Sequence, residues 1–259
     1  MSDIVHYLHR GPAALITLNR PDKRNALSRA LIAALLDAFK RAADDPTARC
    51  VILTGNGPAF CAGMDLDELR GTLGADAHQV WDDAKKLATL YDFIYTLPKP
   101  TIAAVNGAAV AGGAGLVTVC DLAVSVPEAK FGYPEVRRGL VAAMVMPHLL
   151  RHVGERMARW LLLTGELIDG LTALRAGLIN QITMPETLLE TADAWACAVA
   201  EGGPQALAQT KKLLYRCSLQ SLSVEELARG SAEPRLTEEC RHGLTAFFEK
   251  KPAPWSCHR

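Results

Sequence analysis

The hydrophobic positions predict alternating strands and helices. Two apolar runs, 13–18 and 50–54, have the length of buried strands and enclose a segment with a different period. In that segment, apolar residues recur at steps of three and four behind Ser28, a residue type preferred at helix N-caps: Ile32, Leu35, Leu36, Phe39 and Ala43. This part of the chain therefore predicts a strand, an amphipathic helix and a second strand.

The same alternation continues to about residue 185. It predicts a helix at 79–96, a strand at 101–105, a glycine-rich turn, a short helix to 119, a strand at 122–126, two helical segments and a strand at 179–183. Alternating elements with short connections indicate an α/β fold. Residues 186–250 instead read almost entirely as helix, broken at Gly202-Gly203-Pro204. We expect this helical region to pack on the core or on another subunit.

Composition and charge narrow the class of protein. The chain has 259 residues, of which 49% are hydrophobic and 22% charged, enough to bury one large core. Its 28 Lys and Arg residues balance 28 Asp and Glu residues, which argues against a nucleic-acid partner or an anionic membrane surface. Residues 100–120 carry no charge and approach the length of a membrane span, but they are rich in glycine and alanine. They predict a buried segment of the core.

Cysteine and histidine positions do not indicate a metal site. The seven cysteines are scattered and none forms a Cys-x-x-Cys pair, so we expect reduced thiols and a cytoplasmic location rather than a disulfide framework or a zinc site. The first residues lack the basic and apolar regions of a signal peptide. His148 and His152 have metal-compatible spacing but no evident third ligand, and we expect both on a helix surface.

Three segments are candidates for chemistry: 55–69, 106–116 and 131–140. Each follows or adjoins a predicted strand, where α/β proteins usually place ligand crevices. In 106–116 glycines stand where a strand passes into a helix, so backbone N–H groups could face an anion. The third glycine of a dinucleotide fingerprint is replaced by Thr118, and no Walker lysine follows. Close helix packing explains these glycines about as well as a ligand does.

Six motifs follow one another along the chain. They are Ile16-Thr-Leu-Asn-Arg-Pro-Asp-Lys-Arg-Asn-Ala-Leu27, Val51-Ile-Leu-Thr-Gly with Ala59-Phe-Cys-Ala-Gly-Met-Asp-Leu, Ala104-Val-Asn-Gly, Cys120-Asp-Leu-Ala, Phe131-Gly-Tyr-Pro-Glu135 and Phe247-Phe-Glu-Lys-Lys. In this order they resemble the crotonase (enoyl-CoA hydratase/isomerase) superfamily. The resemblance runs from about residue 12 to 255. Any one motif would be weak evidence, whereas six in compatible order are a strong signal.

The resemblance implies an α/β spiral of ββα units with a helical C-terminal trimerisation region. It divides the chain into a core at 1–195, which holds the CoA-ester site, and a trimerisation region at 196–259. It also implies an acyl-CoA substrate, no cofactor other than the coenzyme A of that substrate, and a homotrimer or a dimer of trimers. Lys250 and Lys251 would then reach the CoA phosphates of a neighbouring subunit, as point-charge ammonium groups can.

The resemblance also assigns roles to individual residues. The backbone N–H groups of Met64 and Gly112 would form an oxyanion hole for an enolate, and Glu135 would be the catalytic acid and base. Ala62, Met64 and Leu66 would line the path of the adenine and pantetheine groups. Without the resemblance, the loop at 62–66 would more often simply pack on the core, and Glu135 would be a solvated or ion-paired residue. Partial burial beside an enolate site should raise the pKa of Glu135.

One position departs from the hydratase pattern and leaves the reaction open. Typical hydratases carry a second glutamate where this chain has Gly115, and double-bond isomerases manage with a single one. The pattern also resembles some methylglutaconyl-CoA-type hydratases, so hydration and double-bond shift both remain. The alternatives are thioester hydrolysis, or a non-catalytic trimer that binds acyl-CoA or RNA. Asp65 is expected to cap a helix that starts near Leu66 rather than to take part in catalysis.

Overall fold

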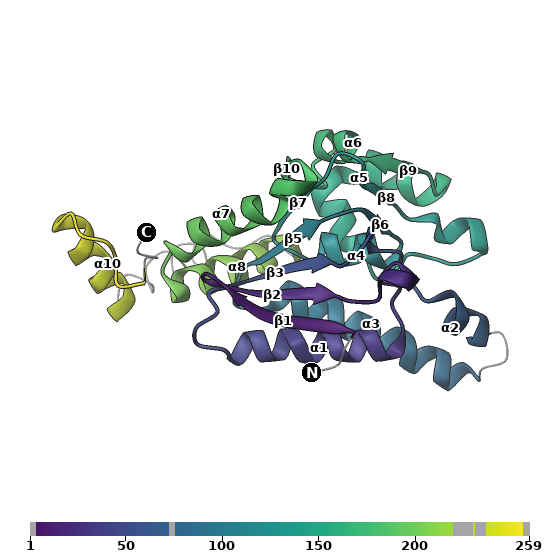
Figure 1. The fold of residues 1–259 in the computed structure, drawn as a ribbon, viewed down its shortest axis with the longest axis horizontal. Helices are drawn as coiled ribbons and strands as arrows, with labels where there is room; N and C mark the ends of the chain where they lie inside the picture. The colour runs from purple at the N-terminus through teal and green to yellow at the C-terminus, as the bar shows by residue number, and fades with distance from the viewer. Residues whose placement is uncertain (1–3, 73–75, 220–229, 231–236, 256–259) are drawn as a thin grey trace.

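A six-stranded sheet forms the centre of the computed structural model, which describes residues 4–72, 76–219, 230 and 237–255 (Figure 1). Its strands, in spatial order, are β1 (Val5–Arg10), β2 (Ala13–Leu18), β3 (Cys50–Gly55), β5 (Thr101–Val105), β7 (Leu122–Ser125) and β10 (Gln181–Ile182). β1 is antiparallel to β2, and every other neighbouring pair is parallel. The α/β class predicted from the periodicity is confirmed.

A second sheet of short strands lies beside the first. Its order is β4 (Ala59–Cys61), β6 (Ala108–Val110), β8 (Lys130–Gly132) and β9 (Leu167–Asp169). The chain leaves β3, β5 and β7 and enters β4, β6 and β8 after only a few residues, then turns into a helix or helical turn each time. This order is the ββα repeat that the resemblance implies. Sequence periodicity missed these strands because three residues are too few to show alternation.

Helices and short helical turns connect and cover the strands. They are η1 (Pro21–Lys23), α1 (Arg29–Asp44), α2 (Leu66–Gly71), α3 (Ala77–Thr96), α4 (Gly112–Thr118), η3 (Pro134–Arg138), α5 (Met146–Thr164), α6 (Gly170–Arg175), η4 (Pro185–Thr187), α7 (Leu188–Ala200), α8 (Pro204–Leu219) and α10 (Glu238–Phe248). The Ser28 hydroxyl accepts the Leu31 N–H at 3.1 Å, so the predicted N-cap of α1 is confirmed.

The predicted strand at 179–183 was too long. Only two residues form β10, because the apolar residues before it belong to the turn that ends α6. There the Leu178 N–H donates to the Ala173 carbonyl at 2.9 Å, and both Leu178 and Ile179 are buried. Their apolar character reflects packing in that turn rather than a sheet ladder.

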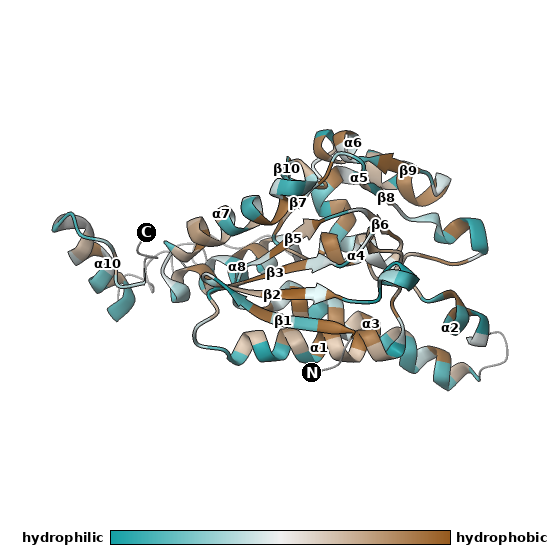
Figure 2. Cartoon of the chain, viewed as in Figure 1, coloured by the Kyte–Doolittle hydropathy of each residue, from teal (hydrophilic) through white to brown (hydrophobic). Residues whose placement is uncertain are grey.

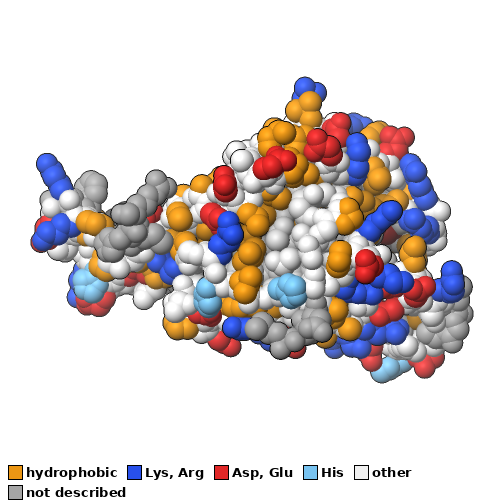
Figure 3. Space-filling model, in the orientation of Figure 1, with side chains coloured by type: hydrophobic (Ala, Val, Ile, Leu, Met, Phe, Trp, Pro, Cys, Tyr) orange, Lys and Arg blue, Asp and Glu red, His pale blue; other side chains and the backbone are white. Residues whose placement is uncertain are grey.

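The central strands are apolar and the covering helices are amphipathic, as the hydropathy colouring shows (Figure 2). Residues 101–105 are all buried, and so is most of the uncharged segment that follows, as the sequence predicted. In the described part of the chain, no helix is both long and apolar enough to cross a membrane. Acidic and basic side chains are interspersed around the end of the molecule near α2 (Figure 3), in keeping with the balanced charge.

The C-terminal region is helical where it is described. α7 packs on β3, β5 and β7, and α8 starts at Pro204, directly after the predicted break. α10 lies beyond the end of α8 and away from both sheets (Figure 1). Arg49 ties the region to the core, because its guanidinium donates to the carbonyls of Gly202 at 2.7 Å and Trp255 at 2.9 Å.

A fully buried asparagine holds the loop before α1 against the turn between β3 and β4. The Asn25 side chain accepts the Arg20 N–H at 2.8 Å and donates to the carbonyls of Asn56 at 3.0 Å and Ala59 at 2.8 Å. Its φ of 55° lies in the left-handed region, where asparagine is tolerated better than most residues. Asn25 thus satisfies three backbone groups in one buried position.

We predict that Asn25→Ala lowers the free energy of unfolding by about 2–4 kcal/mol, because three backbone groups lose their partner and alanine is strained at this φ. Asn56→Ala removes only an exposed side-chain bond to Asn19 and should cost less than about 1 kcal/mol. Denaturant unfolding of the two variants measures the difference. Equal losses of unfolding free energy in the two variants would show that the three hydrogen bonds of Asn25 are unimportant for stability.

Candidate active site

Three adjacent strand ends bring the predicted site residues together. β4 pairs with β6 and β6 pairs with β8, and both pairs are parallel. Parallel neighbours end at the same edge of a sheet, so the loops that follow them meet there. Met64, Gly112 and Glu135 each come two or three residues after one of these strands. The sheet therefore gathers three residues that are far apart in the sequence.

A cavity of about 760 Å³ opens at this edge. Ala62, Met64, Leu66, Gly112 and Glu135 all border it, as do residues of α3 and of the segment 140–145. Lys250 and Lys251 do not border it: they follow α10, which lies far from α2 in Figure 1, and Lys251 pairs with Glu249 at 2.9 Å. A role for these two lysines at the site would need a second subunit, and it stays a prediction.

Two backbone N–H groups at the cavity have no partner in the part of the chain that the structure describes. Leu27 bonds to the residues on either side of Met64, donating to the Gly63 carbonyl at 2.7 Å and accepting the Asp65 N–H at 3.1 Å. In the described ranges, no acceptor is found for the N–H of Met64 or of Gly112. Two fixed, unpaired donors at a cavity are what an oxyanion hole requires.

The two donor segments approach closely because glycine lacks a side chain. A Cβ added at Gly63 would lie 2.9 Å from the Val110 carbonyl oxygen and 3.3 Å from the Gly112 nitrogen, and the φ of Gly63 is +86°. A Cβ added at Gly113 would lie 2.0 Å from the Cys61 carbonyl oxygen. Only bare backbone permits β4 and α4 to pack at these distances.

The residue before α4 is strained. Ala111 has φ 52° and ψ −123°, a conformation that costs a non-glycine residue about 1–3 kcal/mol. Its N–H donates to the Gly132 carbonyl at 2.8 Å, which helps to hold it there. This strain turns the chain from β6 into α4 within one residue. Backbone strain of this kind is concentrated at functional sites.

Glu135 is half-buried on η3, with an unpaired oxygen. Among the residues that the structure places, its Oε2 atom is buried and has no hydrogen-bond partner. Burial raises the pKa of Glu135, opposed by its own backbone N–H and by the charge of Arg138. The raised pKa expected from the sequence is confirmed in direction. Its neighbour Arg137 points elsewhere, because its Nε donates to the Thr164 carbonyl at 3.0 Å.

Tyr91 borders the same cavity and was not singled out from the sequence. Its side chain is buried, and its hydroxyl donates to the Gly112 carbonyl at 2.7 Å. In the predicted helix it stands on the apolar stripe together with Leu87, Leu90 and Ile94. An aromatic residue on such a stripe is usually part of the core, so no pattern in the sequence could have identified it.

Asp65 has the structural role that the sequence predicted. Its carboxylate accepts the Asp67 N–H at 3.0 Å and caps α2, and it pairs with Arg20 at 2.8 Å. Burial alone would raise the pKa of Asp65, but these hydrogen bonds and the charge of Arg20 outweigh it, and the pKa is lowered. A carboxylate held in this way stays ionised and is a poor proton shuttle.

His148 and His152 make separate contacts. The His148 ring packs edge-on against Tyr95 with centroids 4.5 Å apart, and burial lowers its pKa to about 4. A ring nitrogen of His152 lies 2.9 Å from the Thr118 carbonyl oxygen. Within the described part of the chain, no three His, Cys, Asp or Glu side chains are grouped to hold a metal ion.

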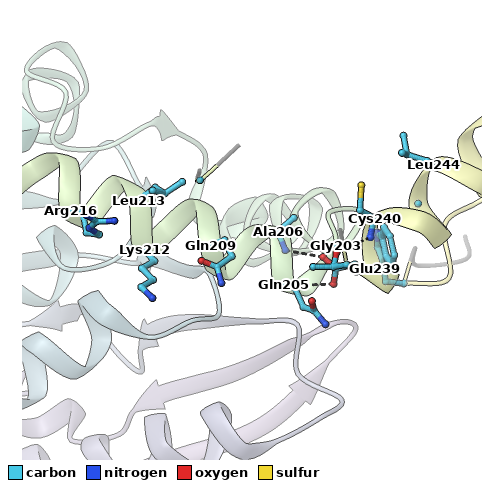
Figure 4. A pocket seen from close by; sticks show the side chains of 14 residues that line it. Gly203, Gln205, Ala206, Gln209, Lys212, Leu213, Arg216, Glu239, Cys240 and Leu244 are labelled. Atoms are coloured by element: carbon cyan, nitrogen blue, oxygen red, sulfur yellow. Dashed lines mark hydrogen bonds between the residues drawn. The ribbon is translucent and has the colours of Figure 1, made fainter. Parts of the chain in front are cut away.

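A second cavity, of about 530 Å³, lies between α8 and α10 (Figure 4). Its main charged contact is structural, because the Glu239 carboxylate accepts the N–H groups of Gln205 and Ala206, each at 2.8 Å, and so caps α8. None of the predicted site residues borders this cavity. The cavity at the edge of the short sheet is therefore the candidate active site.

Comparisons with known proteins agree on one family. The family model described as enoyl-CoA hydratase/isomerase matches residues 10–258. A Thermus thermophilus protein, provisionally named an enoyl-CoA hydratase, is 43% identical over 249 residues, covering 95% of this chain and 98% of that protein. The 2,3-dehydroadipyl-CoA hydratase of Escherichia coli is 36% identical over 250 residues, 92% of each chain.

Solved structures share the fold. An enoyl-CoA hydratase from Shewanella pealeana matches with a TM-score of 0.93 at 32% identity, covering 97% of this chain and 96% of that one. The crotonase-type fold expected from the motifs is thereby confirmed. These similarities identify the fold, while the roles of individual residues rest on the geometry of the cavity.

We predict that Arg138→Gln moves the titration of Glu135 to higher pH, because it removes the positive charge that favours the ionised carboxylate. The shift should be less than about one pH unit, since Arg138 is exposed and screened. The carboxyl ¹³C resonance of Glu135, assigned as the one lost in Glu135→Gln, reports this titration. Arg137→Gln is the matched control and should leave it in place. A shift to lower pH in Arg138→Gln would contradict the electrostatic account.

Proposed function

We propose that this chain, which belongs to the enoyl-CoA hydratase/isomerase family, acts on an enoyl-CoA thioester by stabilising an enolate, with Glu135 moving the protons. The observation that carries the proposal is that one cavity is bordered by both an unpaired hydrogen-bond acceptor and unpaired hydrogen-bond donors. The acceptor is a buried carboxylate oxygen and the donors are two backbone N–H groups, and none of them has a partner among the residues that the structure describes. Unpaired polar groups are costly to bury, and they persist where a substrate pairs with them.

The two N–H groups match the charge that develops during such a reaction. When a proton leaves the carbon next to a thioester, negative charge grows on the thioester oxygen. The N–H groups of Met64 and Gly112 would donate to that oxygen, and their fixed backbone needs no reorganisation. The Met64 side chain takes no part in this contact.

One carboxylate suffices for a double-bond shift. Ionised Glu135 takes a proton from C2 of a 3-enoyl thioester, and the electron pair moves onto the thioester oxygen. The neutral acid then returns the proton to C4, the electron pair moves back, and a 2-enoyl thioester results. The raised pKa of Glu135 suits both halves, because a base near its pKa both accepts and releases a proton readily.

Hydration can use the same groups. The oxygen of a water molecule bonds to C3 of a 2-enoyl thioester while Glu135 takes a proton from that water, and the electron pair of the C2=C3 bond moves toward the thioester oxygen. The neutral Glu135 then gives the proton to C2 of the enolate, the electron pair moves back, and the product is a 3-hydroxyacyl thioester. Because a hydratase of the typical pattern shares this work between two acids, Glu135 would have to carry it alone here.

The lining of the cavity suits an acyl chain attached to coenzyme A. Charged side chains such as Arg24, Arg70 and Arg138 border the cavity, and apolar side chains make up much of the rest of its lining: Met64, Leu66, Leu69, Val80, Leu87, Leu140, Val141 and Met144. Ala62 and Leu66 would line the path of the pantetheine and adenine groups. Coenzyme A enters as part of the substrate, and none of the proton-transfer steps calls for another cofactor.

We predict that Glu135→Gln retains binding of a CoA ester but loses turnover by roughly 10²–10⁴-fold, the usual contribution of general acid–base catalysis. Its melting temperature should not fall, because the change removes a poorly solvated charge. The assay is mass spectrometry of 2-enoyl, 3-enoyl and dehydroadipyl thioesters of CoA incubated with the protein in deuterated water. Mass spectrometry after chromatographic separation of the 2-enoyl and 3-enoyl isomers reports hydration, deuterium exchange, double-bond shift and hydrolysis together.

The outcomes of this assay separate the alternatives. Hydration or double-bond shift that depends on Glu135 supports the proposal, and the ratio of their rates says which reaction dominates. Release of free CoA as the main product would make the protein a thioester hydrolase. Binding without any exchange or turnover would make it a non-catalytic acyl-CoA protein. Unchanged turnover in Glu135→Gln would remove this residue from the mechanism.

We further propose that residues 196–259 assemble the protein into a trimer or a dimer of trimers. The support is the position of α10 beyond the core, together with apolar side chains of this region that face solvent. Leu214 on α8 is 65% exposed and Leu244 on α10 is 50% exposed. Amphipathic helices bury such side chains when a partner is present.

We predict that the wild type sediments as a trimer or hexamer at micromolar concentration and that Leu214→Asp weakens this assembly, because an interface core tolerates charge poorly. Leu8→Asp is the control: Leu8 is 61% exposed on β1, at the edge of the core sheet. Analytical ultracentrifugation distinguishes the species. A well-folded wild-type monomer under these conditions would refute the trimer.

A further inference from the structure

Tyr91 lies at the closed end of the cavity. One stripe of α3 lines the space, with Val80 and Ala84 near its start and Leu87 and Tyr91 further along. Val80 is 42% exposed whereas Tyr91 is only 2% exposed, so the stripe runs from the mouth of the cavity into the core. Asp83 of α3 also borders the cavity, but its carboxylate pairs with Arg29 at 2.6 Å. Tyr91 brings its hydroxyl to the deeper end of the stripe.

The Tyr91 hydroxyl fits against two glycines of α4. A Cβ added at Gly112 would lie 3.0 Å from the hydroxyl oxygen, and one added at Gly115 would lie 2.7 Å from it. Both contacts are shorter than normal van der Waals distances for such atoms. The hydroxyl therefore reaches the Gly112 carbonyl, at 2.7 Å, only because neither position carries a side chain.

We propose that Tyr91 is a positioning residue of the oxyanion hole, which fixes the Gly112 backbone through its hydroxyl and fills the space beside Gly115 that a second acid would need. This inference rests on the proposed function, because it assigns a purpose to the Gly112 N–H. It explains two features together: the buried phenol, and the glycine where the hydratase pattern has a glutamate.

The hydrogen bond acts on a residue with little conformational restraint of its own. Gly112 has no side chain to limit its backbone angles, and it follows the strained Ala111. The Tyr91 hydroxyl holds the carbonyl of Gly112 from the neighbouring helix and so fixes the peptide next to the donor N–H. Small displacements of a catalytic group reduce turnover strongly. The hydrogen bond from Tyr91 should therefore affect kcat more than KM.

The space beside Gly115 is already occupied. An added Cβ would lie 2.5 Å from Cγ1 of Val145 and 2.8 Å from Cζ of Tyr91, in addition to its contact with the hydroxyl. A glutamate at position 115 could enter only if both Val145 and Tyr91 moved, and movement of Tyr91 would release Gly112. The absence of a second acid at this position thus depends on Gly115, Tyr91 and Val145 together.

The first test is Tyr91→Phe, which keeps the ring and removes the hydroxyl. We expect kcat on the best enoyl-CoA thioester to fall roughly 10–100-fold, with KM changed by less than about threefold. Tyr95→Phe is the matched control, one turn later on α3 and outside the cavity, and should keep kcat within about twofold of the wild type. Circular dichroism verifies that both variants are folded.

The second test adds a methyl group at Gly115 in two backgrounds. Gly115→Ala should lower kcat at least about tenfold in the wild type, because the methyl displaces the Tyr91 hydroxyl. In a Tyr91→Leu, Val145→Ala background, which lacks the hydroxyl, the end of the ring and Cγ1 of Val145, the same change should alter kcat by less than about twofold. Equal effects in the two backgrounds would show that the methyl group acts through some other contact, and would overturn the role of Tyr91.

These outcomes separate the inference from the function on which it rests. If Glu135→Gln loses turnover but Tyr91→Phe behaves like Tyr95→Phe, the role of Tyr91 is wrong and the proposed function stands. A rise in KM with unchanged kcat in Tyr91→Phe would also overturn the role, since it would make Tyr91 a binding residue. If Glu135→Gln keeps full turnover, the proposed function fails first.

Discussion

The close packing of α4 against the backbone of β4 is the constraint on which the site depends. At Gly113 the helix touches the Cys61 carbonyl so closely that no Cβ would fit, and Gly63 meets the start of the helix in the same way. This contact fixes the distance between two loops that follow different strands. It leaves the N–H groups of Met64 and Gly112 at one cavity, and it forces Ala111 into a strained conformation.

Most buried polar side chains have hydrogen-bond partners, whereas one at the cavity lacks a partner in the described part of the chain. Asn25 pairs with three backbone groups, and Asp65 pairs with Arg20 while it caps α2. In the described part of the chain, two buried side-chain oxygens instead have no hydrogen-bond partner, the hydroxyl of Tyr133 and Oε2 of Glu135. A fold satisfies its polar groups wherever stability alone matters. Both exceptions lie in the segment that follows β8, and the Glu135 oxygen belongs to the candidate active site.

The cavity also shows how one residue can change the chemistry open to a shared fold. At position 115 the typical hydratase pattern has a glutamate and this chain has a glycine. Tyr91 and Val145 occupy the space that a side chain at this position would need, so the space beside Gly115 is filled. With Gly115 at this position, Glu135 would act without a second acid beside it, which would suit the transfer of a proton between two carbons as well as a hydration that depends on one acid.

The sequence by itself determined the long elements and the family. Apolar runs and helical periods predicted β2, β5, α1 and α3 nearly to the residue, because each is long enough to show its period. Ordered motifs also made Met64, Gly112 and Glu135 candidates for the site, since their spacing is a property of the chain, and the structure brings the three to one cavity. Short strands, a tyrosine on an apolar stripe and the space beside Gly115 could not be predicted in this way. They depend on distances between segments far apart in the sequence, and only the tertiary structure decides those.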